Sequence, residues 1–263
     1  MPSAKKPGER EPHIEVRGLH VAYDGRDILR DVAFTVGRGD VFAVTGGSGS
    51  GKSTLLRAMV GLVEPEEGEV TYAGQSFTNA ERRERARMLR RFGVLYQRGA
   101  LWSERTLAEN VGLVLEEFTP LAPAEVRELA ALKLALVGLS GFEDYLPNEV
   151  SGGMQKRAGI ARAMALDPEV LFLDEPSAGL DPITSRHLDD LILALSSSLG
   201  ATVVVVSHEL DSLFTIADNG VFLDSETQTI LARGSPQDML EHCPLEKVQS
   251  FFRRGPTEVR PRP

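Results

Sequence analysis

The sequence predicts an α/β fold built on a largely parallel sheet, and three observations lead to this prediction. Near-continuous apolar runs at Val170–Leu173 and Thr202–Val206 are typical of parallel strands that are covered on both faces. In the second half of the chain, helix and strand patterns alternate. A glycine-rich segment at residues 46–54 lies between an apolar run at 41–44 and a helical run at 55–60. Strand, glycine loop and helix in this order form the context of a phosphate-binding loop.

The composition is that of an ordinary globular protein, with 42% hydrophobic and 25% charged residues among 263. This length suits one large domain, or one domain with an additional lobe. The formal net charge of -9 argues against a nucleic-acid partner. The single cysteine, Cys243, excludes an intrachain disulfide and a zinc site built from cysteines, which fits a reducing compartment. We expect a soluble chain, since we find no secretory signal and no apolar run of the ~20 residues that span a bilayer.

The first part of the chain is predicted to be mainly strand, after a charged tail at residues 1–12 that we expect to be disordered. The expected strands are residues 14–22, 32–36, 41–44, 69–73 and 93–97. Residues 79–91 contain six arginines among glutamates, and this mixture of charges predicts a helix with a solvated face.

The middle of the chain is predicted to be a helical lobe inserted between two strands of the core. Between residues 104 and 147, leucine, valine and alanine recur at helical spacing and strand patterns are absent. A helical region from Ser235 to Phe252, with a break near Pro244, is expected before a basic, proline-rich end. The other elements expected after the lobe are a helix at 156–165 and strands at 170–173, 202–206, 221–223 and 229–232.

The glycine-rich segment matches the phosphate-loop pattern G-x-x-x-x-G-K-[ST] through Gly46, Gly51, Lys52 and Ser53. Glycines let successive backbone N–H groups turn toward phosphate oxygens, and the N-terminus of the following helix adds partial positive charge. Lys52 can reach the β- and γ-phosphates, and the Ser53 hydroxyl can ligate Mg²⁺. The residues predicted to bind the nucleotide here are Gly46, Gly47, Ser48, Gly49, Ser50, Gly51, Lys52, Ser53 and Thr54.

Two carboxylates, Asp174 and Glu175, close the apolar strand at 170–173. In a phosphate-loop enzyme the first carboxylate can hold Mg²⁺, directly or through water. The second can orient or deprotonate the attacking water. Alone, the pair indicates only a solvated strand end. Together with the phosphate loop, it predicts a hydrolytic site at the carboxyl edge of the sheet.

Four further features are ambiguous when each is taken alone. Ser151–Gly153 precedes a helix and forms either a second anion site or an ordinary N-cap. His208 ends a core strand and either contacts a phosphate or is a structural histidine. Gln97 either contacts Mg²⁺ or its water or is a polar strand terminus, and Tyr23 either stacks on adenine or packs half-buried. In isolation, the structural alternative is favoured for Ser151–Gly153 and for His208.

The order of these features along the chain resembles the nucleotide-binding subunit of ABC transporters, over about residues 14–235. One departure is Met154, where the family commonly has glutamine, but the backbone donors of that turn survive the change. Beyond the phosphate loop, the nucleotide-binding residues that the resemblance implies are the adenine-stacking Tyr23, the signature residues Ser151, Gly152, Gly153 and Gln155, and the D-loop residue Asp181. The implied catalytic residues are the base Glu175, the switch histidine His208 and the Q-loop residue Gln97, and the implied metal ligands are Ser53, Gln97 and Asp174.

The resemblance also implies an architecture, cofactors and partners. The fold would be a P-loop NTPase (ABC ATPase) core with an antiparallel β subdomain and an inserted α-helical subdomain at about residues 98–150. The ATPase domain would span residues 13–235, followed by a helical and basic C-terminal extension at 236–263. ATP and Mg²⁺ would be the cofactors. A homodimer would sandwich two ATP molecules, and a separate membrane permease would be the partner, with no nucleic acid.

A narrower likeness rests on residues 96–102, 151–154 and 181–185, which are similar to the ATPase subunit of bacterial Mla-type phospholipid transport systems. This likeness implies phospholipid transport between membranes, an MCE-domain substrate-binding protein as a further partner, and a cytoplasmic, peripheral location on the inner membrane. The alternatives are the ATPase of another solute ABC importer and an ABC-type cell-division regulator. A soluble DNA-maintenance ATPase would carry long coiled coils or zinc modules, and the sequence contains neither pattern.

The only tryptophan, Trp102, follows Leu101 just outside the strand that ends at Gln97. Two large apolar residues close to Gly99 suit a groove that receives an amphipathic helix, and the resemblance implies that the permease supplies one there. The alternative, with equal support, is that Trp102 packs inside the helical lobe.

Overall fold

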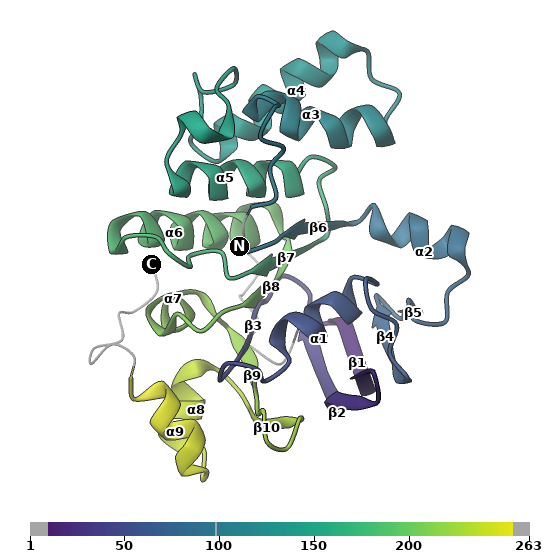
Figure 1. Cartoon of the computed structure of the whole chain (residues 1–263), viewed down its shortest axis with the longest axis vertical. Coiled ribbons are helices and arrows are strands. Elements are labelled where there is room, and N and C mark those ends of the chain that lie inside the picture. The colour runs from purple at the N-terminus through teal and green to yellow at the C-terminus, as the bar shows by residue number, and fades with distance from the viewer. Residues whose placement is uncertain (1–9, 98, 255–263) are drawn as a thin grey trace.

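The computed structural model describes residues 10–97 and 99–254, and it shows two sheets with helices around them (Figure 1). The larger sheet has the strand order β10-β9-β3-β8-β7-β6, and its neighbouring strands are parallel except for β9 and β10. Its strands are β3 (Val41–Gly46), β6 (Phe92–Leu95), β7 (Val170–Asp174), β8 (Thr202–Val206), β9 (Asn219–Leu223) and β10 (Ile230–Arg233). β3, β7 and β8 are buried along their whole length, which confirms the predicted parallel core.

The smaller sheet has the order β2-β1-β4-β5 and is antiparallel, which confirms the predicted β subdomain. Its strands are β1 (Pro12–Tyr23), β2 (Arg26–Gly37), β4 (Glu67–Tyr72) and β5 (Gln75–Ser76). The predicted strand at residues 32–36 is shorter than the observed one, because β2 begins at Arg26 and continues through Asp31. Asp31 has a φ of 46°, and this irregularity interrupts the alternating pattern that marks a strand.

α1 (Lys52–Met59) packs against both sheets and joins their cores. Leu55, Leu56 and Met59 are buried in one apolar cluster with Leu29 of β2 and Phe172 of β7. The phosphate loop connects β3 to α1, so both of its ends are fixed by buried elements.

The helical lobe predicted in the middle of the chain is confirmed, between β6 and β7 (Figure 1). It contains α3 (Leu107–Phe118), α4 (Pro123–Leu136) and a 3-10 turn at Pro147–Glu149. Thr106 and Glu109 form a capping box that starts α3. α2 (Arg82–Leu89), which precedes β6, buries Met88 alone among its residues, as expected of a solvated helix.

The remaining helices are α5 (Gly152–Ala163), α6 (Pro182–Leu199), α7 (Leu210–Ile216), α8 (Pro236–His242) and α9 (Glu246–Phe252). The helix predicted at 156–165 begins earlier, at Gly152, because Ser151 caps it and both glycines are helical. Ser235 caps α8 as predicted, and the predicted break near Pro244 separates α8 from α9.

The predicted disordered tail covers residues 1–12, of which the structure describes 10–12. For these three residues the prediction is wrong: Pro12 begins β1, and Arg10 forms an ion pair with the buried Asp40 at 2.8 Å. Residues 1–9, and the basic end of the predicted extension at 255–263, lie outside the described residues. Within the described part of the chain, no helix combines the length and the apolar character that crossing a membrane requires.

Candidate nucleotide-binding site

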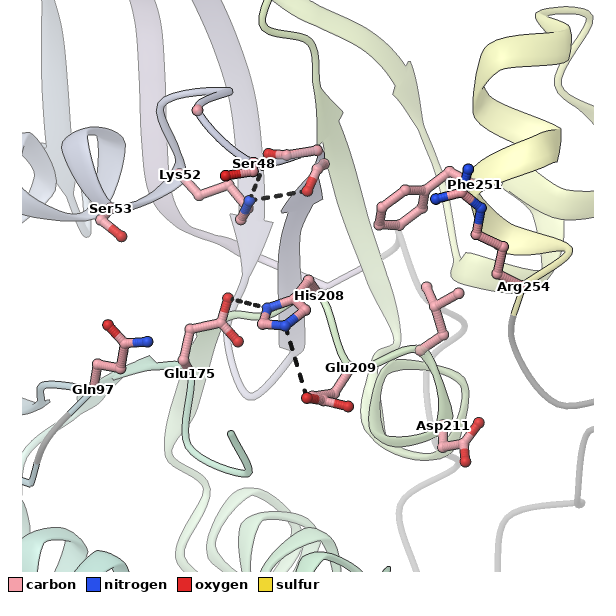
Figure 2. A pocket seen from close by; sticks show the side chains of 14 residues that line it. Ser48, Lys52, Ser53, Gln97, Glu175, His208, Glu209, Asp211, Phe251 and Arg254 are labelled. Atoms are coloured by element: carbon pink, nitrogen blue, oxygen red, sulfur yellow. Dashed lines mark hydrogen bonds and ion pairs between the residues drawn. The ribbon is translucent and has the colours of Figure 1, made fainter. Parts of the chain in front are cut away.

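The carboxyl ends of four parallel strands place the predicted catalytic residues around one cavity of about 720 Å³ (Figure 2). The phosphate loop follows β3, Gln97 follows β6, Glu175 follows β7 and His208 follows β8. The cavity is lined by Gly46, Gly47, Ser48, Gly49, Lys52, Ser53, Gln97, Glu175, His208, Glu209, Leu210, Asp211, Phe251 and Arg254. This is the crevice at strand ends where open α/β sheets bind ligands.

The phosphate loop has a backbone that few residues other than glycine adopt. Gly46 has a φ of 145°, and a Cβ at this position would lie 2.1 Å from the backbone oxygen of Leu223. The Lys52 ammonium donates hydrogen bonds to the carbonyl oxygens of Gly46 and Gly47, each at 2.9 Å. No side chain caps the N-terminus of α1, so its first N–H groups remain available to phosphate oxygens. Burial lowers the pKa of Lys52, and the nearby carboxylates of Glu175 and Asp174 oppose this shift.

Glu175 and His208 form a contact across the cavity from the phosphate loop (Figure 2). His208 Nδ1 lies 2.7 Å from Glu175 Oε1, and the Ser207 hydroxyl donates to the other carboxylate oxygen at 3.4 Å. The backbone of Glu175 is left-handed, with a φ of 48°, and its N–H donates to the carbonyl oxygen of Val206 at 2.8 Å. The chain turns sharply away from β7 at this residue, which leaves the buried carboxylate directed at the cavity.

Of the three residues predicted to hold Mg²⁺, Ser53 and Asp174 are in contact, and Ser53 and Gln97 line the cavity while Asp174 does not. The Ser53 hydroxyl donates to Asp174 Oδ1 at 3.4 Å, and Gln97 lines the same cavity. Burial and the adjacent Glu175 raise the pKa of Asp174. In the described residues, no group of three or more histidine, cysteine or acidic side chains could hold a metal unaided. The hydroxyl of Ser53 and the carboxylate of Asp174 are the kind of oxygen donors that suit Mg²⁺, which is commonly bound by one or two side chains together with substrate phosphates.

Lys156 of α5 was not singled out in the sequence, and it connects two of the catalytic segments. Its buried ammonium donates to the backbone oxygen of Gln97 and, at 3.1 Å, to the backbone oxygen of Glu175. Burial lowers the pKa of Lys156, and the carboxylates of Asp174 and Glu175 raise it. The ammonium thus holds the ends of β6 and β7 together behind the cavity.

The second half of the predicted nucleotide site does not line this cavity. Exposed Ser151 caps α5 by accepting from the N–H of Met154 at 3.3 Å. The Gln155 amide donates to the carbonyl oxygens of Pro147, at 2.8 Å, and Val150, so it holds the turn before α5. Predicted binding residues outside the cavity lining are Tyr23, Ser50, Gly51, Thr54, Ser151, Gly152, Gly153, Gln155 and Asp181.

Asp181 and Tyr23, unlike most of the phosphate loop, do not line the cavity. Asp181 is the N-cap of α6, and its carboxylate accepts from the N–H groups of Ile183 and Thr184 at 3.0 and 3.1 Å. The Thr184 side chain also donates to it, and these bonds lower the pKa of Asp181. Tyr23 ends β1 and is 41% exposed, so its ring remains accessible to a stacking partner.

Sequence reasoning missed five residues that line the cavity. Glu209 and Asp211 follow His208, and the carboxylate of Glu209 lies 3.8 Å from His208 Nε2, so proximity along the chain was an available signal. Phe251 of α9 and Arg254, two residues after that helix ends, reach the cavity from the C-terminal part of the chain (Figure 2). No local pattern predicts their approach. The fifth residue of this set is Leu210.

The fold and the cavity define an ABC-type ATPase cassette: a phosphate-loop core with an antiparallel β subdomain, an inserted helical lobe, and a hydrolytic pair opposite the loop. The chain belongs to the ABC transporter family, whose characteristic sequence pattern matches residues 29–178. Two solved structures support the fold. The protein cbiO1 of Clostridium perfringens, part of the ABC transporter complex cbiONQ, matches with a TM-score of 0.80 and 26% identity, over 88% of this chain and 92% of that one.

A dimeric ATP-binding cassette, solved in a post-hydrolysis state with ADP and Pi, matches with a TM-score of 0.76 and 28% identity, over 84% of this chain and 97% of that one. Among curated proteins, the intermembrane phospholipid transport system ATP-binding protein MlaF of Escherichia coli K12 is 37% identical, over 91% of this chain and 88% of MlaF. The probable ribonucleotide transport ATP-binding protein mkl of Mycobacterium tuberculosis is 40% identical over 78% of this chain. The chain spans only 57% of the length of mkl.

Proposed function

We propose that the chain is the ATP-binding and hydrolysing subunit of an ABC transporter and energises a separate membrane permease in phospholipid transport between membranes. The observation that supports hydrolysis most directly is the shared cavity that holds the phosphate loop, Gln97 and the contact between Glu175 and His208. A protein that only bound nucleotide would need the loop but not a carboxylate directed at the phosphate position.

Each residue predicted from the sequence to act in catalysis or metal binding has a defined role in this proposal. The loop N–H groups and Lys52 bind the phosphates and stabilise the charge that develops in the transition state. Glu175 orients and deprotonates the attacking water, while His208 holds that carboxylate and contacts the terminal phosphate. Bound Mg²⁺, held by Ser53 and Asp174 with Gln97 nearby, would neutralise charge on the phosphate oxygens.

A second copy of the chain would complete the nucleotide site. Ser151 and Asp181 lie outside the cavity lining, although the family resemblance assigns both to nucleotide binding. The related cassette that was solved with ADP and Pi is a dimer. We infer that two copies face each other, and that the Ser151–Gly153 turn of each contacts the nucleotide held by the phosphate loop of the other.

The substrate and location are inferred from MlaF, which this chain matches along nearly its whole length. By this likeness the partners are a permease and an MCE-domain protein, and the chain acts peripherally on the cytoplasmic face of the inner membrane. The match to mkl favours an alternative, the ATPase of another solute importer, but it covers a smaller part of that relative.

Trp102 is proposed as a contact for the permease. The residue is 64% exposed, which rules out the alternative that it packs inside the lobe. The buried Asn110 holds the loop rigidly: its side chain accepts from the N–H of Trp102 at 2.7 Å and donates to the backbone oxygens of Trp102, Arg105 and Thr106. The backbone that carries the exposed indole is thus held by hydrogen bonds, and tryptophan is enriched among interface hot spots.

One experiment tests the function, and a variant tests the contact. Purified with its native membrane partners and reconstituted in vesicles, the complex should move phospholipid, and not ribonucleotide, only with hydrolysable ATP. Trp102→Ala should weaken permease binding by roughly 2 kcal/mol or more while the melting temperature of the free subunit stays constant. A lower melting temperature with normal co-purification would remove Trp102 from the interface. Absence of lipid transfer by the intact complex would remove the phospholipid assignment.

A further inference from the structure

A buried carboxylate lies on α6, outside the nucleotide cavity. Asp189 is 4% exposed, and its Oδ2 accepts a hydrogen bond from the Ser212 hydroxyl at 3.0 Å. The Ser212 oxygen also lies 3.3 Å from the Ser185 hydroxyl and 3.5 Å from the Ser177 hydroxyl. Burying a carboxylate is costly, and an apolar side chain would fill this position on α6 at a lower cost. The stability of α6 alone therefore gives no reason for an acid at this position.

The hydroxyl groups around Asp189 connect the two segments that carry the hydrolytic pair. Ser177 follows Glu175 by two residues, and Ser212 of α7 follows His208 by four. Glu175 and His208 are themselves in contact at 2.7 Å. The contacts form a closed ring. The chain runs from Glu175 to Ser177, and the Ser177 hydroxyl contacts Ser212. The chain also connects Ser212 to His208, and His208 contacts Glu175.

The ring depends on a group that takes the Ser212 proton. Ser212 has one hydroxyl proton and two lone pairs. The shortest of its three contacts is to Asp189, so the carboxylate takes this proton in preference to Ser177, to which Ser212 could donate only over 3.5 Å. A lone pair of Ser212 can then accept from the Ser185 hydroxyl. Without an acceptor at position 189, the Ser212 proton must be shared among serines, and the network loses one of its hydrogen bonds.

We propose that Asp189 is a positioning residue for ATP hydrolysis: through Ser212, it fixes α7 against the segment that follows Glu175 and so sets the contact between His208 and Glu175. This inference rests on the proposed ATPase activity. It adds a residue that contacts neither nucleotide nor metal and acts through two serines.

The electrostatic surroundings of Asp189 are consistent with this role. Burial raises the pKa of Asp189 to about 7, the hydrogen bond from Ser212 opposes the shift, and the charges of Asp190 on α6 and Asp211 on α7 add to it. Near neutral pH the carboxyl group is therefore partly protonated. Asparagine is a close mimic of the neutral form and keeps an oxygen that can accept from Ser212.

The test compares variants of the full chain in ATP turnover, ATP affinity and melting temperature. For Asp189→Ala we expect kcat to fall about tenfold, since misplacing catalytic groups by a fraction of an ångström has effects of this order, while KM for ATP changes less than about twofold. Asp189→Asn should restore kcat to within about twofold of wild type. Ser212→Ala should match Asp189→Ala, and the double variant should be no slower than either, because both changes break one contact. Asp190→Asn, an exposed neighbour, is the matched control and should behave as wild type.

A second readout does not require turnover, so it separates this inference from the proposed activity. The His208 imidazole resonances of the nucleotide-free chain should shift in Asp189→Ala and Ser212→Ala and stay in place in Asp190→Asn. Unchanged His208 resonances in a folded Asp189→Ala, or a kcat within about twofold of wild type, would overturn the inference. If alanine at 189 prevents folding, Ser212→Ala decides by the same criteria, and an Asp189→Asn variant more than about twofold slower than wild type would also count against the inference. A wild-type chain with no turnover would count against the proposed ATPase activity alone.

Discussion

The predicted nucleotide site has two halves, and a single chain brings together the residues of only one of them around a cavity. The phosphate loop, Gln97, Glu175 and His208 come from four strand ends and line one cavity. Ser151 and Asp181, from the start of α5 and α6, lie outside that lining, and both serve as helix caps. The first half is therefore brought together around one cavity by the fold of one chain, whereas the second half does not line that cavity.

Under the proposed function, this difference would separate the residues that bind and hydrolyse ATP from those that depend on assembly. A parallel sheet brings its strand ends together whether or not a partner is present, so the phosphate half needs only the correct fold. Under the proposed dimer, the capped turn at Ser151 would acquire a ligand only when another copy is placed against it. Changes in the first half should therefore alter binding and turnover, and changes in the second half should alter assembly.

The largest effect should come from Glu175→Gln, in the phosphate half. The substitution keeps the size of the side chain and removes the base, which typically costs about 10²–10⁴-fold in turnover. Mg-ATP binding should be unchanged, because Glu175 is not a phosphate donor. Turnover close to wild type in the purified complex would show that another group activates the water.

Lys52→Ala should weaken Mg-ATP binding in the isolated chain by about 10–100-fold, since a charged hydrogen bond to phosphate is worth about 1.5–3 kcal/mol. Isothermal titration calorimetry measures this directly. The substitution also removes the bonds to the oxygens of Gly46 and Gly47, so the melting temperature of the nucleotide-free chain is a necessary control. Unchanged affinity would place the phosphates elsewhere in the cavity.

Ser151→Arg should act on assembly and leave nucleotide binding by one chain intact. Overpacking an interface typically costs about 1–3 kcal/mol, so ATP-induced dimers should dissociate about tenfold or more readily. Sedimentation in a Glu175→Gln background, where ATP is not consumed, makes the measurement. A normal dimer there would mean that the two halves of the site do not meet as inferred.

The smallest effect on turnover is expected for Asp189→Asn. Asp189 is linked through Ser212 to the segment that joins Glu175 to Asp181. Its pKa is about 7 in the folded chain, whereas an unperturbed aspartate has a pKa of 3.8. Between these values the folded state holds more protons than the unfolded state, so this group makes stability fall as pH rises from about 4 to 7. Asp189→Asn should show a smaller decrease in melting temperature over that range, by about ten degrees in total. Asp190→Asn removes one of the charges that raise this pKa, so it should reduce the slope much less than Asp189→Asn, and equal slopes in all three proteins would contradict the assigned pKa.

The same comparison explains what the sequence could predict. The phosphate loop and the pair Asp174–Glu175 are contiguous motifs whose backbone context is local, so both could be recognised and placed at one sheet edge. The predicted starts of β2 and α5 were too late. In each case a single residue, Asp31 in β2 and Gly152 in α5, interrupts the sequence pattern typical of a strand or a helix. These local irregularities are stabilised by strand pairing and by helix capping, which the secondary-structure propensities of single residues do not describe.

Contacts between distant segments could not be predicted where the residues belong to no recognisable motif. Phe251 and Arg254 enter the cavity because an apolar cluster holds the C-terminal helices against β9, and that cluster includes Phe222 and Phe252. The amide of Gln155 was assigned to a nucleotide, but it holds the turn before α5. Lys156 carries no motif, and only the folded chain shows that its ammonium joins the segments after β6 and β7.

The left-handed backbone at Glu175 has a consequence for the stability of this chain. A non-glycine residue in that region typically costs about 1–3 kcal/mol of folding stability, and here the cost falls on the residue assigned as the base. Glycine would relieve the strain but would remove the carboxylate. The most stable residue for this backbone and the residue that the proposed reaction needs are therefore different, and a more stable chain with glycine at this position would lack the proposed base.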